Sequence, residues 1–207
     1  MSTFTTSSTH DQARLAWRTV DLLTVTMIGV AIGVAYWGWD LAYAGISQAA
    51  VFAYVPLSGL LAGPWLLAGV VGGLVVRKPG AALLAELVAA NVEYLVGNQW
   101  GASTLISGFL QGLGVEIVLA IFLYRRFSVG VAVLAGVLAA TLESVYEWYA
   151  YFPDLPFRDQ LAYLGFFALS GAIVAGVGGW LLVRALAAAG ALDAFAAGRE
   201  HRDRSAS

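Results

Sequence analysis

The chain has 207 residues, of which 60% are hydrophobic and 12% are charged, and its mean hydropathy is +0.78. An ordinary soluble domain carries about 25% charged residues, so this composition predicts an integral membrane protein. The absence of cysteine excludes a disulfide framework and thiolate metal sites, and eleven scattered basic residues with a net charge of -2 argue against nucleic-acid binding.

Apolar runs long enough to cross a bilayer core of about 30 Å recur after a polar N-terminal tail, residues 1–16. The predicted spans are residues 20–44, 55–76, 80–96, 103–123, 129–150 and 160–187. We expect one transmembrane domain over residues 17–190, followed by a polar C-terminal tail over residues 191–207. The predicted fold class is therefore an all-α integral membrane protein, a bundle of six transmembrane helices in the plasma membrane.

Basic residues define the orientation of these spans. When six crossings alternate, nearly all of them fall on one side: Arg14, Arg18, Arg77, Lys78, Arg125, Arg126, Arg184, Arg199, Arg202 and Arg204. Arg158, flanked by two aspartates, is the exception. The positive-inside rule then predicts that both termini are cytoplasmic.

Acidic residues inside the spans are the strongest functional signal. Glu86 and Glu93 lie seven residues apart, on one face of a predicted helix that contains no Lys or Arg. Ionisable groups at membrane depth are expensive and point to function. This stripe predicts one wall of a pocket for an organic cation. For Glu116 we expect instead a structural contact with a neighbouring helix, or with Arg125 or Arg126.

Aromatic, amide and further acidic side chains gather at the same predicted level as this stripe. Trp and Tyr rings attract cations, carboxylates supply charge, and amides hydrogen-bond ring nitrogens and amines. The candidate ligand-binding residues are Glu86, Glu93, Tyr94, Asn98, Gln99, Trp100, Gln111, Trp37, Glu143 and Tyr146. Other interpretations stay open: the rings can form the interfacial belt, Glu143 and Glu147 can simply be hydrated, and Asp40 can end a helix.

Several catalytic and energy-coupling motifs are absent. The chain has no Gly-x4-Gly-Lys-Ser/Thr phosphate loop, no His-Glu-x2-His motif and no Gly-x-Ser-x-Gly motif. The chain therefore cannot drive transport with ATP by itself. We expect no catalytic residue, no metal site and no cofactor, and hence a protein that is not an enzyme.

Six short segments of the chain have a distinctive residue pattern: residues 18–23, 59–65, 77–82, 85–90, 97–101 and 111–116. They resemble the YkoE type of substrate-binding (S) component of energy-coupling factor (ECF) vitamin transporters, and the resemblance extends over roughly residues 17–200. It implies a six-helix membrane protein that binds thiamin or its hydroxymethylpyrimidine precursor from outside. It also implies a transmembrane coupling (T) subunit, which Ala31 and Ala35 on the first helix would meet, and ABC ATPase subunits.

Two other functions remain possible from the residues alone. One is an autonomous, proton-linked secondary transporter of a cationic small molecule, in which Glu86 and Glu116 titrate. The other is a membrane scaffold that does not transport. Small-residue pairs such as Gly29 with Gly33 are compatible with all three, because they favour close packing of helices in lipid.

Overall fold

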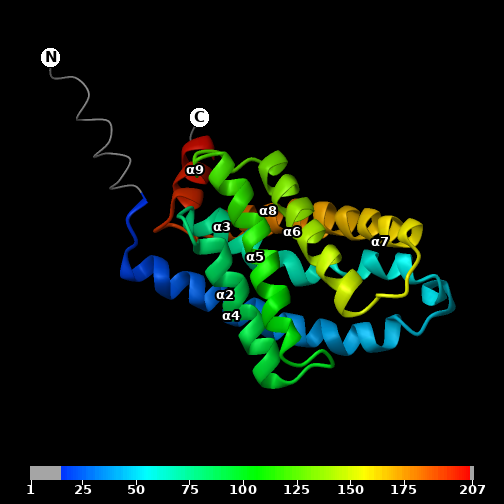
Figure 1. Ribbon diagram of the computed structural model, residues 1–207. Coiled ribbons are helices and arrows are strands. Elements are labelled where there is room, and N and C mark those ends of the chain that lie inside the picture. Colours follow the sequence, from blue (N-terminus) through cyan, green and yellow to red (C-terminus); the bar gives the residue numbers. More distant parts are fainter. Residues whose placement is uncertain (1–14, 206–207) are drawn as a thin grey trace, which may run out of the picture.

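The computed structural model describes residues 15–205, so most of the tail predicted over residues 1–16 lies outside the described residues. Every regular element in the described part is a helix, which confirms the all-α fold class (Figure 1). In chain order the elements are α2 (Thr19–Ile46), η1 (Ala50–Ala53), η2 (Val55–Leu61), η3 (Gly63–Leu66), α3 (Leu67–Val76), α4 (Ala81–Val96), α5 (Ser103–Ile121), α6 (Val129–Ala150), α7 (Phe157–Ser170), η4 (Gly171–Gly178), α8 (Gly179–Ala188) and α9 (Ala196–Ser205).

Four helices in residues 15–205 are long and apolar enough to cross a membrane: α2, α5, α6 and the continuous unit Phe157–Ala188. A fifth candidate combines Val55–Leu61 with Gly63–Val76, two pieces bent by 47°. The remaining predicted span corresponds to α4, whose 16 residues are fewer than the roughly 20 that cross a bilayer core. The structure thus gives four or five candidate spans, against six predicted.

The bend replaces what the sequence predicted as one uninterrupted span over residues 55–76. Pro56 and Pro64 lie in the first turns of η2 and η3, where the missing N–H of proline is tolerated but a long α-helix is not continued. Ser170 of α7 satisfies the interrupted backbone, because its hydroxyl accepts from Gly63 N at 2.9 Å and donates to the Leu60 carbonyl at 2.6 Å. The break is therefore a stable part of the fold.

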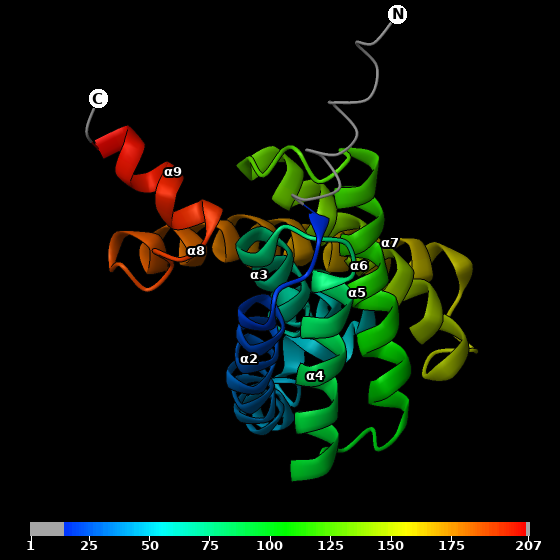
Figure 2. The ribbon, with the colours of Figure 1, turned by 90° about the vertical axis from the view of Figure 1, so that its left-hand side faces the viewer.

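α3 lies at the centre of the bundle, with residues 68–76 buried, and packs against α2, α4, α5 and α8 (Figure 2). Around it, α4 packs on α2 and α5, and α6 packs on α5 and η4. Gly29 and Gly33 permit the α2–α4 contact, since a Cβ at either would lie 2.7 Å from a backbone oxygen of α4. This small-residue pair therefore serves packing inside the bundle.

Ion pairs gather at one end of the bundle. Buried Lys78 contacts the carboxylate of Asp21, which also pairs with Arg18. Arg77 pairs with Glu200 at 2.6 Å and thereby ties α9 to the end of α3. The segment predicted as a polar C-terminal tail thus contains a helix, and Phe195 and Ala197 beside and within it are buried.

Candidate functional site

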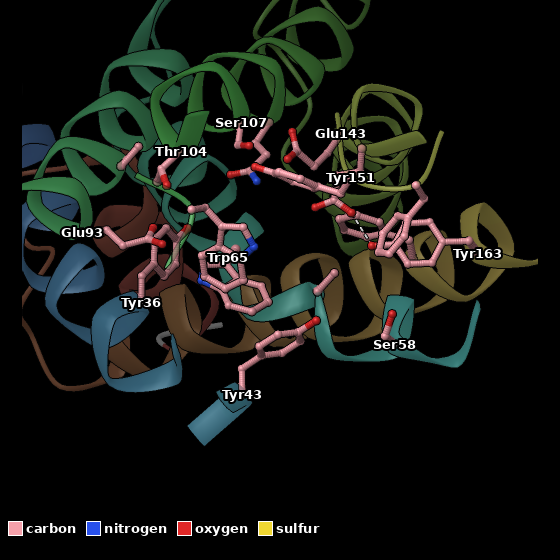
Figure 3. A pocket seen from close by; sticks show the side chains of 17 residues that line it. Tyr36, Tyr43, Ser58, Trp65, Glu93, Thr104, Ser107, Glu143, Tyr151 and Tyr163 are labelled. Carbon is pink, nitrogen blue, oxygen red and sulfur yellow. Dashed lines mark hydrogen bonds between the residues drawn. The ribbon is translucent and has the colours of Figure 1, made fainter. Parts of the chain in front are cut away.

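A cavity of about 220 Å³ lies between the helices (Figure 3). A single water needs only about 10–15 Å³ of such space, so the cavity has room for an organic molecule. It is lined by Tyr36, Tyr43, Ser58, Ala62, Trp65, Ala90, Glu93, Trp100, Thr104, Ser107, Gln111, Glu143, Glu147, Tyr151, Phe152, Tyr163 and Phe167. These residues come from α2, η2, η3, α4, α5, α6 and α7 and from the adjoining loops.

Three carboxylates face this cavity. Glu93 is 3% exposed and Glu143 is 1% exposed, and Glu147 accepts a hydrogen bond from the hydroxyl of Tyr163. Glu143 lies within hydrogen-bonding reach of Ser107, and its buried Oε2 has no hydrogen-bond partner. No Lys, Arg or His lines the cavity within the described part of the chain. The site therefore offers negative charge and an unused acceptor to whatever enters it.

An aromatic cluster forms another wall of the cavity. The ring centroids of Trp65 and Trp100 lie 5.3 Å apart in an edge-on arrangement, and Tyr43 lies 5.3 Å from Trp65 and 5.6 Å from Trp100. Trp39 extends the cluster outside the cavity, with its centroid 6.2 Å from that of Trp65. These contacts fix the orientation of the rings, so that their faces can stack on a flat ligand or attract a cation.

Polar groups of α5 and of the loop after α6 complete the lining. Thr104, Ser107 and Gln111 recur at helical spacing on α5 and line the cavity. Figure 3 shows Ser107 beside Glu143. The hydroxyl of Tyr151 lies 2.8 Å from Oγ of Ser103, and burial raises the pKa of Tyr151 to about 12. This phenol is therefore a neutral hydrogen-bonding group at any physiological pH.

Glu86, the residue that led us to predict a pocket, lies behind the cavity wall. Its carboxylate accepts from the Tyr36 hydroxyl at 2.8 Å and from Gly69 N at 2.6 Å, and the same hydroxyl accepts from Ala68 N at 2.8 Å. Ala68 and Gly69 are in the first turn of α3, whose N–H groups have no partner within the helix. Glu86 therefore caps α3.

Glu116 has a comparable role at α4. Its carboxylate accepts from the backbone N–H groups of Gly80 at 2.6 Å, Ala82 at 3.1 Å and Leu83 at 3.3 Å, and from the Tyr124 hydroxyl. The expected structural contact with a neighbouring helix is thus present. A negative charge at this position also complements the positive end of the helix dipole.

Of the ten sequence-based candidates, the structure brings Glu93, Trp100, Gln111 and Glu143 together around the cavity. The other six candidates do not line it. They are Glu86, described above, and Trp37, Tyr94, Asn98, Gln99 and Tyr146. Trp37 and Tyr94 are 36% and 40% exposed, on outward faces of their helices. Asn98 instead stabilises the loop after α4, where it donates to Thr104 and accepts from the N–H groups of Trp100 and Gly101.

Sequence reasoning missed most of the cavity's rings. They are Tyr36, Tyr43, Trp65, Tyr151, Phe152, Tyr163 and Phe167. Two signals could have found some of them. Tyr36 and Tyr43 are seven residues apart on one face of α2, and Tyr163 and Phe167 are four apart on one face of α7.

Comparisons with known proteins identify the family of this chain. Residues 20–142 match the family described as an ABC-type cobalt transport system, permease component. An HMP/thiamine permease protein of Bacillus subtilis (strain 168), YkoE, is 31% identical over 193 residues, which cover 89% of this chain and 92% of the relative. The crystal structure of an S-component of an ECF transporter superimposes with a TM-score of 0.82 at 28% identity, covering 91% of this chain and 95% of that one. The chain belongs to the YkoE-type S components of ECF transporters.

This S component is a transport protein and not an enzyme, since its relatives are transporter subunits. It is a multi-pass protein of the plasma membrane, in agreement with its apolar helices. The carboxylates and rings described above are thus the walls of a cavity inside the substrate-binding subunit of a transporter.

Proposed function

We propose that this S component captures extracellular thiamin, or its hydroxymethylpyrimidine precursor, in the cavity between α2 and α7. The supporting observation is the combination of three carboxylates with an aromatic wall and no basic residue in the described lining. Thiamin carries a permanently positive thiazolium ring and an aminopyrimidine ring with hydrogen-bonding groups. The name of the Bacillus subtilis relative points to the same pair of compounds.

The charge of the cavity favours thiamin over a neutral compound. Buried carboxylates without cationic partners are unstable as anions, and a bound cation supplies the missing partner. Cation–π attraction to Trp65 and Trp100 adds about 0.5–2 kcal/mol, and more in a dry site than at a surface. Hydroxymethylpyrimidine lacks a fixed charge, so it uses only the hydrogen-bonding groups, Glu143 and Gln111 among them.

We further propose that the chain crosses the membrane six times with both termini in the cytoplasm. This topology counts the bent unit Val55–Val76 as one span and α4 as a short one. It is supported by the ion pairs of Arg18, Arg77 and Lys78, which lie at the opposite end of the bundle from Glu93. Glu93 is twelve residues from Ala81 along α4, a distance of about 18 Å.

Assembly with a T subunit and ABC ATPase subunits follows from the proposed role. The chain contains no ATP-binding loop, so energy has to come from other subunits. Ala31 and Ala35 are exposed on the face of α2 that turns away from α4, where their small side chains let another helix approach closely. We propose this face as the T-subunit contact.

A metal ion fits the cavity less well than a vitamin does, although the matched family model carries a cobalt description. No group of three or more His, Cys, Asp or Glu residues within the described chain is arranged to hold a metal ion. Aromatic rings form much of the lining, and rings are not ligands for cobalt.

The proposal is tested by titrating the purified protein with thiamin and with hydroxymethylpyrimidine while recording tryptophan fluorescence. Trp65 and Trp100 line the cavity, so binding should quench their emission. No saturable response to either compound would contradict the proposal. Uptake of thiamin into liposomes that contain this chain alone would instead support an autonomous transporter, a function that the comparisons do not favour.

A further inference from the structure

A fourth carboxylate, Asp40 of α2, lies directly behind the cavity wall. It is 6% exposed, and its Oδ1 accepts from Nε1 of Trp65 at 2.9 Å. Its carboxyl group is also within hydrogen-bonding reach of Glu93. Asp40 therefore touches both a ring and a carboxylate that line the site, without lining the site itself.

The Asp40–Glu93 contact requires a proton or a cation. Oδ2 of Asp40 is buried and has no conventional donor as a partner. Two ionised carboxylates at this separation repel each other strongly in a medium of low dielectric constant. A shared proton removes that repulsion and supplies the donor that a carboxyl–carboxyl hydrogen bond needs.

Within residues 15–205, no Lys, Arg or His lines the cavity beside the pair and could take the place of that proton. The titratable groups that face it are Tyr36 on the same helix, Glu86 on α4 and Glu143 on α6. The side chains that line the cavity from η3 and α5 are Trp65, Thr104, Ser107 and Gln111, none of which carries a charge. The surroundings of the pair are therefore neutral or acidic.

We propose that Asp40 is a positioning residue that shares a proton with Glu93, and that capture of a positively charged ring releases this proton. The inference rests on the proposed function. In the empty site the pair holds one proton and carries one negative charge. A cation that enters next to Glu93 and Trp65 replaces the proton, which passes to solvent, so the total charge is the same before and after. A neutral pyrimidine leaves the proton in place.

This arrangement makes the preference between the two compounds depend on pH. Binding that releases one proton strengthens by up to about tenfold for each unit of pH increase, as long as the free pair remains protonated. Binding of hydroxymethylpyrimidine does not change in this way. The ratio of thiamin affinity to hydroxymethylpyrimidine affinity should therefore rise with pH.

Isothermal titration calorimetry measures the proton directly. The wild-type protein is titrated with thiamin at one pH in buffers of different ionisation enthalpy, and the dependence of the observed enthalpy on the buffer counts the protons released. We expect about one proton per thiamin and none per hydroxymethylpyrimidine. The measurement is repeated from neutral pH to about two pH units above it. Thiamin binding without proton release at every pH in this range would overturn the inference and leave the proposed function intact. No thiamin binding at all would overturn both.

The Asp40→Asn variant separates proton exchange from positioning. An asparagine oxygen still accepts from Trp65, and its amide donates to Glu93, so the pair keeps its geometry without a titrating proton. We expect thiamin binding to persist, with proton release lost and the affinity ratio independent of pH. Asp154→Asn is the matched control, because Asp154 is exposed in the loop between α6 and α7. Proton release that survives in Asp40→Asn would contradict the assignment to this pair.

Discussion

The hydroxyl of Tyr36 donates a 2.8 Å hydrogen bond to the carboxylate of Glu86, and this bond joins α2 to α4 where α3 begins. Both side chains are almost completely buried. The bond forms a small network in which two N–H groups at the start of α3 find acceptors. Glu86 is thus deep in the bundle for a reason of folding, while the cavity takes its charge from Glu93, Glu143 and Glu147.

Glu86→Gln should therefore reduce stability more than ligand affinity. The two carboxylate oxygens of Glu86 accept from the Tyr36 hydroxyl and from Gly69 N. In glutamine an NH2 group replaces one of these oxygens, so one of the two buried donors is left without an acceptor. The expected loss is about 1–3 kcal/mol in the free energy of unfolding. It is measured as a lower thermal unfolding midpoint in detergent, with little change in the Kd for thiamin.

Glu93→Gln is the matched control on the same face of α4. It removes a carboxylate that lines the cavity, so we expect Kd for thiamin to rise by about 10–100-fold, which is the range of hydrogen bonds to charged groups. Its unfolding midpoint should fall less than that of Glu86→Gln. The reverse pattern in the two variants would contradict the division of roles between these glutamates.

Trp100→Ala should weaken thiamin binding by about tenfold, since it removes a ring face from the cavity and loosens Trp65 and Tyr43. Trp37→Ala serves as the control, because Trp37 is 36% exposed and does not line the cavity. Titration calorimetry compares the two. Equal losses in both variants would mean that the ligand does not rest against the aromatic wall.

Glu143→Gln should affect the empty and the loaded protein differently. In the empty protein Oε2 of Glu143 is buried without a partner, so an amide relieves an unfavourable charge. We expect the unfolding midpoint of the empty protein to stay the same or rise, and the increase caused by thiamin to shrink. An unchanged thiamin-induced increase would remove Glu143 from the ligand contacts.

Ala31→Leu should leave folding and thiamin binding intact but impair co-purification with a T subunit, because Ala31 is exposed on α2. Gly33→Ala on the same helix should instead impair folding, while the exposed face of α2 that carries Ala31 stays unchanged. Its added Cβ would lie 2.7 Å from the Ala89 carbonyl oxygen and push α2 away from α4, at about 1–3 kcal/mol. Normal assembly of Ala31→Leu would refute the proposed contact.

Much of the fold could be predicted because long apolar runs leave few alternatives to helices. α6 has the bounds that were predicted, residues 129–150, and α5 ends two residues early. The interruption between η2 and η3 was missed because apolar composition does not reveal a break in direction, although Pro56 and Pro64 are local signals. α9 was missed because its polar sequence contains no apolar run.

The site was harder to predict than the helices. Neighbouring positions on a helix differ by about 100°, so Tyr36 faces the interior while Trp37 faces outward. In a uniformly apolar helix the sequence does not say which of two adjacent rings turns inward. The acidic residues had the same ambiguity, since the sequence alone cannot tell a helix-capping carboxylate such as Glu86 from a cavity-lining one such as Glu93.

The 47° bend in the unit Val55–Val76 separates cavity-lining residues from buried ones. Ser58, Ala62 and Trp65, which line the cavity, all precede α3, whereas residues 68–76 of α3 are buried at the centre of the bundle. Substitutions at Ser58 or Trp65 therefore change the lining of the cavity while the buried residues of α3 stay as they are.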